Sequence, residues 1–259
     1  MTNRRRHNHR LRANGTAGAA LALAMGLASG TVAADEWQFS GTATSLEGEV
    51  LYDSRHQVVG ECRQGLWHPT DHEVTYTESG DESPFATKSL TYLHSALRPS
   101  FEFRQPRFDE VMEVENVNDE RLLIDWQTNE GGTENYRVPI EGLVVVDAGF
   151  DNLVRENWQT LLAGESVDFQ FLAPTRGENY DFVLEPAEDD RITAPHVFRI
   201  RPTGFVLGFL VDPILLGYDD EGALTDYLGL TNVRKDRDNN YTAHVRYRHE
   251  NTPDCALVR

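Results

Sequence analysis

GFDNLVRENWQTLLAG, residues 149–164, is the stretch of this chain whose apolar residues recur with the period of an α-helix. Its polar residues fall on the opposite helical face. The apolar positions are Phe150, Leu153, Val154, Trp158, Leu161 and Leu162. We therefore predict one amphipathic helix over about 150–163, with Gly164 as its left-handed C-cap. A single helix cannot bury its own apolar stripe, so this helix must lie across a sheet.

The segments on both sides of the helix alternate between apolar and polar residues, which is the pattern of half-buried antiparallel strands. The alternating apolar residues are Val50, Tyr52, Val74, Tyr76, Phe101, Phe103, Leu122, Ile124, Trp126, Val167, Phe169, Phe171, Tyr180, Phe182, Leu184, Tyr241, Ala243, Val245 and Tyr247. We predict a mainly β (α+β) fold, in which residues 35–259 form one domain built on a large curved antiparallel sheet or half-barrel.

One segment, residues 203–211, is apolar all round and is followed by Asp212 and Pro213. It predicts a short apolar helix over about 204–211, plugged into the end of the sheet. The functional alternative is a lid over an apolar cavity. Its candidate ligand-binding residues are Phe205, Leu207, Phe209 and Leu210.

The first 34 residues predict a secretory signal peptide. They hold five arginines and no acid, then an apolar run over about 17–28, then small residues up to Ala34. We expect cleavage after Ala34 and a periplasmic or secreted protein. A retained membrane anchor is disfavoured, because the apolar run is shorter than the roughly 20 residues of a membrane-spanning helix.

The charge balance argues against two kinds of partner, nucleic acids and anionic membranes. Removing residues 1–34 takes five positive charges from the formal net charge of −18, which leaves −23. Lys88 and Lys235 are the only lysines. A chain this acidic lacks the basic surface that nucleic acids and anionic membranes require. We therefore expect neither as a partner. The simpler interpretation is that this negative net charge reflects the habitat of the protein and not its function.

Two cysteines, Cys62 and Cys255, follow the predicted signal peptide. Because an exported protein meets oxidising conditions, we predict a disulfide between them, which would join the front of the sheet to the C-terminal tail. Two free thiols are the alternative.

No catalytic signature or cofactor-binding motif is present, since the sequence lacks Gly-x-Ser-x-Gly, a reactive-cysteine pattern and a phosphate-binding glycine loop. His68, Asp71 and His72, with His56 upstream, are the best metal candidates, but solvated loop histidines are the commoner outcome. The acidic runs 188–190 and 219–221 lack the spacing of a calcium loop and are typical of solvated turns. We therefore predict no catalytic residue, no bound metal and no cofactor.

Three further residues complete the predicted ligand-binding set. Arg155 lies on the polar face of the predicted helix, Trp158 lies on its apolar face, and Arg176 follows the strand after it. Either arginine could hold an anionic head group. Internal ion pairing is the alternative.

The runs FDNLVR (150–155), LLAGE (161–165), FQFLAPTR (169–176) and VDPI (211–214) resemble an uncharacterised family of secreted bacterial proteins, and so does YLGLTN (227–232). That resemblance implies no particular activity. More distantly, a signal peptide followed by many antiparallel strands and one covering helix resembles the periplasmic lipoprotein-carrier half-barrel, which holds acyl chains in its concave face. This second likeness is one of architecture and carries over no site residue.

These observations favour a non-enzymatic envelope protein that binds a lipid or another apolar or amphiphilic ligand. The alternatives are a protein-interaction or envelope-assembly module with a filled interior and, third, a metal-dependent hydrolase centred on the histidines.

Overall fold

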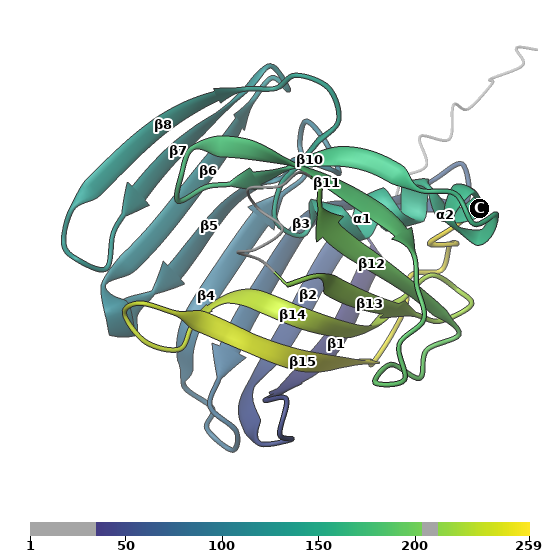
Figure 1. Cartoon of the computed structure of the whole chain (residues 1–259), viewed down its shortest axis with the longest axis horizontal. Helices are drawn as coiled ribbons and strands as arrows, with labels where there is room; N and C mark the ends of the chain where they lie inside the picture. The colour runs from purple at the N-terminus through teal and green to yellow at the C-terminus, as the bar shows by residue number, and fades with distance from the viewer. Residues whose placement is uncertain (1–34, 204–211) are drawn as a thin grey trace, which may run out of the picture. The chain divides into compact units, whose positions relative to one another are not determined.

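The structure is a computed structural model that describes residues 35–203 and 212–259. The predicted segment 204–211 and the predicted signal peptide lie outside the described residues. Fifteen strands form one sheet (Figure 1). They are β1 Asp35–Thr44, β2 Val50–Arg63, β3 Leu66–Thr77, β4 Pro84–Thr91, β5 Ser100–Gln105, β6 Glu110–Val117, β7 Arg121–Gln127, β8 Thr133–Pro139, β9 Val144–Val145, β10 Val167–Ala173, β11 Glu178–Pro186, β12 His196–Pro202, β13 Ile214–Tyr218, β14 Leu224–Arg234 and β15 Asn240–His249.

The strands pair in an almost unbroken antiparallel meander. Their order is β8-β7-β6-β5-β4-β3-β2-β1-β15-β14-β13-β12-β11-β10-β9. The first strand pairs with the last, so both free edges of the sheet, β8 and β9, come from the middle of the chain. The pair β9–β10 is parallel, because the helical segment between these strands makes a crossover. The sheet curves without closing, which confirms the predicted fold class (Figure 1).

The predicted alternation places one apolar set on the enclosed face of the sheet. The buried residues of this set include Tyr52, Val74, Tyr76, Phe103 and Ile124. Val50 differs from the prediction: it is 51% exposed, because it is the first residue of β2 and has no cover there.

The predicted helix is present but broken. It forms α1 Gly149–Glu156 and α2 Trp158–Leu162, with Asn157 between them at φ −108°. The side-chain Nδ2 of Asn157 donates to the carbonyl of Leu153 at 2.9 Å, and such local competition for a backbone acceptor disfavours helix continuation.

The C-terminal end of α2 has the geometry that the sequence predicts. Gly164 has φ +84°, its N–H donates to the carbonyl of Leu161, and the N–H of Glu165 donates to that of Thr160. These two bonds make a Schellman motif, which confirms Gly164 as the left-handed cap.

Both helices pack on the enclosed face of the sheet, against β10–β13. Leu153, Val154, Trp158 and Leu161 form one buried cluster with residues of these strands, among them Phe169, Leu184, Phe198, Ile200 and Leu216. A second cluster lies between β1–β9 and β14–β15. Tyr227 and Tyr247 contact both clusters, so the helices and the second cluster share one face of the sheet.

Cys62 and Cys255 form a disulfide, as the sequence predicts. Next to it, the backbone of Ala256 exchanges hydrogen bonds with Trp67 and Gly65, which fixes the C-terminal tail to the β2–β3 hairpin. Among residues 35–203 and 212–259, neither helix has the length and apolarity that a membrane span requires.

Candidate functional site

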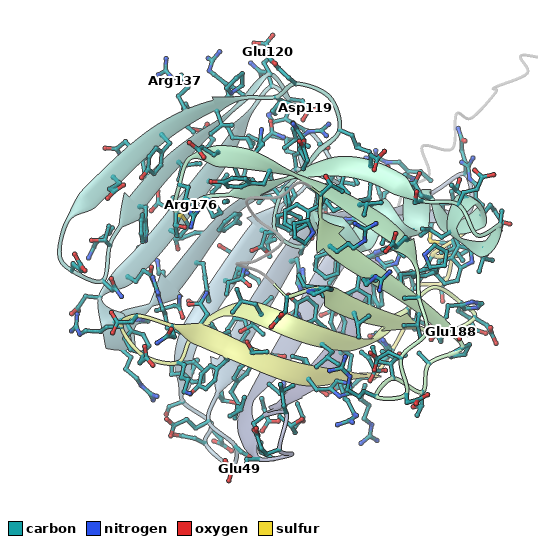
Figure 2. All side chains as sticks on the ribbon, viewed as in Figure 1. Glu49, Asp119, Glu120, Arg137, Arg176 and Glu188 are labelled. Atoms are coloured by element: carbon teal, nitrogen blue, oxygen red, sulfur yellow. A yellow bond between two sulfur atoms is a disulfide. The ribbon has the colours of Figure 1, made fainter. Side chains whose placement is uncertain are left out.

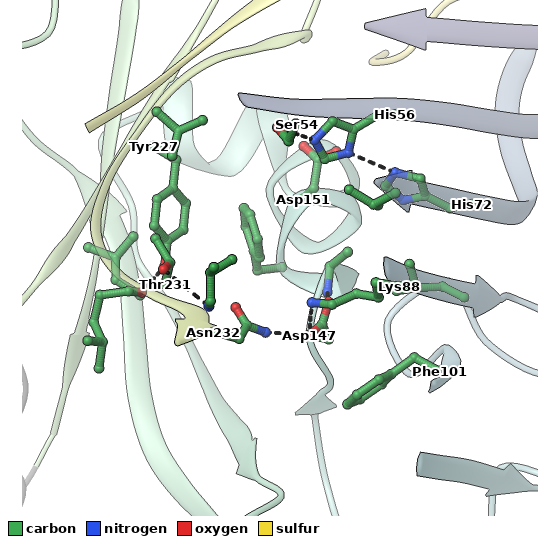
Figure 3. Close-up of a pocket in the computed structure, with 18 of the residues that line it drawn as sticks. Ser54, His56, His72, Lys88, Phe101, Asp147, Asp151, Tyr227, Thr231 and Asn232 are labelled. Carbon is green, nitrogen blue, oxygen red and sulfur yellow. Dashed lines mark hydrogen bonds and ion pairs between the residues drawn. The ribbon is translucent and has the colours of Figure 1, made fainter. Parts of the chain in front are cut away.

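The enclosed face of the sheet leaves a partly open cavity of about 380 Å³. Inward-facing residues of β1–β4, β14 and β15 form much of its wall, and the segment 146–151, which leads from β9 into α1, contributes on another side (Figure 3). The wall is mostly apolar with a few polar groups, which is the composition of small-molecule sites.

Aromatic side chains make up a large part of this wall. They are Phe39, Tyr52, Tyr76, Phe101, Phe150, Phe171, Tyr227 and Tyr247. Burial raises the pKa of the four tyrosine hydroxyls, so these groups stay neutral and act as hydrogen-bond donors and acceptors. The aromatic part of the wall is therefore uncharged, and its polar groups are the tyrosine hydroxyls.

A buried ion pair lies in the wall. Lys88 Nζ donates to Asp147 at 2.8 and 3.0 Å, and the two side chains are only 5% and 8% exposed. Asp147 also accepts hydrogen bonds from the side chain of Asn232 and the N–H of Ala148 (Figure 3). The ammonium group lies 4.6 Å from the ring centre of Phe103. Lys88 is thus held by a carboxylate on one side and an aromatic ring on another.

Asp147 has a backbone conformation that is unusual for a residue with a side chain, at φ +44°. Residues in this region cost on the order of 1 kcal/mol or more and persist where the surroundings fix them. Here four hydrogen bonds from Lys88, Asn232 and Ala148 hold the carboxylate. These contacts hold the Asp147 carboxylate against Lys88 in spite of the unusual backbone conformation.

A second polar group links β2 and β3. His56 Nδ1 lies 3.0 Å from His72 Nε2, His56 Nε2 lies 3.0 Å from Ser54 Oγ, and Ser54 Oγ donates to the carbonyl of Gly41 (Figure 3). Burial, then the neighbouring charges, lower the pKa of His56 well below its usual range and that of His72 to about 3. Both imidazoles are therefore neutral.

This chain of hydrogen bonds is poorly suited to nucleophilic catalysis. A base next to a serine must accept a proton, and a carboxylate normally stabilises the resulting imidazolium. Among the described residues, no carboxylate hydrogen-bonds to His56 or His72. The Ser54 hydroxyl is also directed at Gly41. We interpret the chain as a neutral polar network.

Asp151, on α1, also lines the cavity. Its carboxylate accepts hydrogen bonds from Tyr218 at 3.0 Å and pairs with Arg155 one turn later at 2.7 Å. The Arg155 guanidinium stacks 4.9 Å from the ring of Trp37 and donates to the carbonyl of Gly222. Arg155 therefore compensates the Asp151 charge from behind the wall.

The structure describes three of the seven predicted ligand-binding residues, and none of these three is among the residues that line the cavity. Arg155 is in the internal ion pair that was the alternative interpretation. Trp158 is buried against His196, Phe198 and Tyr218. Arg176 is exposed in the β10–β11 turn beside Tyr180 (Figure 2). The other four, Phe205, Leu207, Phe209 and Leu210, lie outside the described residues.

The structure brings two of the four candidate metal ligands together, since His72 points inward to His56. The other two lie apart from them: Asp71 is exposed, and His68, near the start of β3, pairs with Glu61 of β2. Within residues 35–203 and 212–259, no group of three or more metal-binding side chains is placed to hold an ion. The acidic runs form turns, in which Asp189 pairs with Arg191 and Asp219 accepts from backbone N–H groups.

Sequence reasoning missed Lys88 and Asp147. The sequence does carry a signal for Lys88. This lysine lies between Ala86 and Leu90, at a position where the alternation of β4 would place an apolar residue. A lysine at such a position is a buried charge that needs a partner. Asp147 is 59 residues away along the chain and follows a two-residue strand, so its role depends on the tertiary structure.

Comparison with known proteins identifies no family. No protein-family model matches the sequence, and no curated protein matches it. One similar solved structure is described as a β-barrel-like protein of domain of unknown function DUF1849 from Brucella abortus. The two sequences are 9% identical, the match covers 84% of this chain and 96% of the other, and the TM-score is 0.43. At this level the likeness carries no argument about function, and the resemblance to a secreted bacterial family stays a prediction.

Proposed function

We propose that this protein binds an amphiphilic small molecule, such as a lipid or a fragment of one, in the cavity of its curved sheet. The observation that supports this proposal is the cavity of about 380 Å³, whose mostly apolar wall carries a few convergent polar groups. An interaction module with a filled interior would need no such space. The arrangement therefore favours a binding protein over a module.

The proposal also places the protein in the periplasm or outside the cell. The arginine-rich, then apolar, start of the sequence supports export. The disulfide between Cys62 and Cys255 supports an oxidising compartment.

A cavity-filling substitution tests the proposal. Ala148 lines the cavity at the start of α1 and is half-buried, so Ala148→Phe would place a ring in the space. We expect the wild-type protein to bind N-phenyl-1-naphthylamine, an apolar dye whose fluorescence rises when it leaves water, and the variant to bind it at least about tenfold more weakly. Native mass spectrometry after solvent extraction would show whether a ligand co-purifies.

Ala163→Phe is the matched control, because Ala163 ends α2 and is exposed. It should leave dye binding unchanged. No dye binding by the wild-type protein, together with a bare polypeptide mass, would refute the proposal, as would equal loss of binding in both variants.

A further inference from the structure

The charges around the cavity cancel. Among the described lining residues, the charged side chains are Lys88, Asp147 and Asp151. Lys88 and Asp147 pair with each other, and Asp151 pairs with Arg155 behind the wall. The Lys88–Asp147 pair is buried, and Arg155 compensates the charge of the partly exposed Asp151, so the charges of these four side chains sum to zero.

The remaining titratable groups of the wall are neutral as well. Burial lowers the pKa of His56 and His72 and raises that of the lining tyrosines. At neutral pH the imidazoles carry no positive charge and the phenols no negative one. The wall thus offers hydrogen bonds without a free counter-charge.

A charged head group would be poorly accommodated here. The two carboxylate oxygens of Asp151 are already held, one by Arg155 and the other by Tyr218. A carboxylate could reach Lys88 only by displacing Asp147, and an ammonium could reach Asp147 only by displacing Lys88. Either exchange leaves one buried charge without its partner, a change that costs several kcal/mol in proteins. A hydroxyl or carbonyl oxygen avoids this cost, because the wall groups can hydrogen-bond to it as they stand.

The outer surface adds an independent argument against anions. The chain after residue 34 has a formal net charge of −23, and Figure 2 shows Glu49, Glu120 and Glu188 at its periphery. Such a field repels anionic ligands on approach.

The size of the site sets a limit on the ligand, since a cavity of about 380 Å³ lies at the small end of the ~300–1,000 Å³ range of small-molecule sites.

We propose that the cavity selects an uncharged amphiphile: a small apolar body with a hydroxyl or carbonyl head. This inference rests on the proposed function and narrows its ligand class. The paired Lys88 and Asp147 exclude both signs of charge, and the neutral tyrosine hydroxyls of the wall supply the polar contacts.

Three ligands that differ only in the head group test the proposal: decan-1-ol, decanoate and decylammonium, measured by calorimetry at pH 7. Only the binding that Ala148→Phe abolishes counts, because decylammonium also adsorbs to an acidic surface. We expect the wild-type protein to bind decan-1-ol at least about tenfold more tightly than either ion.

Removing one partner of the ion pair should change this selectivity in opposite directions. Asp147→Asn leaves the Lys88 charge free and should turn the preference to decanoate, whereas Lys88→Met leaves Asp147 free and should turn it to decylammonium. The double variant restores neutrality and should prefer decan-1-ol again. Lys235→Met, at an exposed lysine, is the control and should behave as wild type.

The outcomes separate the two proposals. If neither the dye nor any of the three ligands binds the cavity, the proposed function fails. If the dye binds but the wild-type protein prefers decanoate or decylammonium, or does not distinguish the three, the inference on charge is overturned and the binding function stands. If the single variants do not fold, the wild-type and double-variant preferences decide.

Discussion

At the scale of single residues, the two histidines of the wall depend on neutrality for their burial. His56 and His72 lie 3.0 Å apart, and Lys88 is among the charges that act on both. Asp147 is the neighbouring charge that opposes these effects at His72. Protonating either imidazole would put a second positive charge beside Lys88 in a buried site.

We therefore predict that stability falls as the pH is lowered from 7 to 5. The pKa of His72 is about 3 in the folded protein and near 6.5 when unfolded. The unfolded chain thus binds the proton first, so the contribution of His72 is complete above pH 6.5 and is lost progressively below it. At ~1.4 kcal/mol per pH unit, His72 alone should cost about 2 kcal/mol at pH 5, measured by urea unfolding.

His72→Gln should flatten this pH dependence, because glutamine can still donate to His56 and does not titrate. The exposed His94 provides the control His94→Gln, which should keep the wild-type slope. Equal slopes for all three proteins would contradict the assignment.

At the scale of elements, the end of α2 determines how the chain returns to β10. Gly164 has φ +84°, and a Cβ added there would meet no atom within 4 Å. A substitution at this position therefore tests backbone conformation without steric clash.

Gly164→Ala should lower the free energy of unfolding by about 1 kcal/mol, because alanine resists the left-handed region that the Schellman motif requires. Urea unfolding measures the change. Gly132→Ala is the control: its φ is not in the left-handed region and its Cβ would make an ordinary contact, at 3.4 Å from Thr128. A cost as large at Gly132 would show that the cap is not the cause.

At the scale of the whole described fold, β1 pairs with β15, so the first and last strands of the sheet lie side by side. The disulfide joins residues 193 apart in the sequence and holds the tail beside Trp67, where Leu257 completes a small buried cluster. Val258 packs against Gly222, at the turn before β14. The tail thus ties the β2–β3 hairpin to the β13–β14 turn.

Removing the disulfide with Cys62→Ala and Cys255→Ala should lower stability by up to about 5 kcal/mol in the chain-entropy model. Amide hydrogen exchange should increase first in residues 254–258, while β2 and β3 stay protected by their neighbours in the sheet. Unchanged protection of the tail would mean that its packing on Trp67 is sufficient without the bond.

Local patterns predicted most of the elements. Alternation identified the inward residues of β3, β5 and β7, and the helical period identified 150–163, since both patterns reflect which side of a single element is buried. The break at Asn157 was missed because an amphipathic pattern is unaffected by a change of axis between two short helices. Val50 was assigned to the buried face because alternation does not show where a strand loses its cover.

The candidate site could not be predicted in the same way. A residue that packs in a core and one that faces a cavity show the same alternation, so the sequence could not separate Tyr76 at the cavity from Leu122 in the packed interior. Arg155 was proposed as a ligand anchor, but Asp151 one turn earlier takes its charge.

The sequence by itself determined the β-rich fold class, the amphipathic helical segment with its glycine cap, and the pair of cysteines. Each depends on residues close together in the chain or on a simple count. Only the tertiary structure decided that Lys88 meets Asp147, that His56 meets His72, and that a space remains between them. These contacts depend on strand register and on the curvature of the whole sheet, which arise from many weak interactions between distant segments and have no local signature.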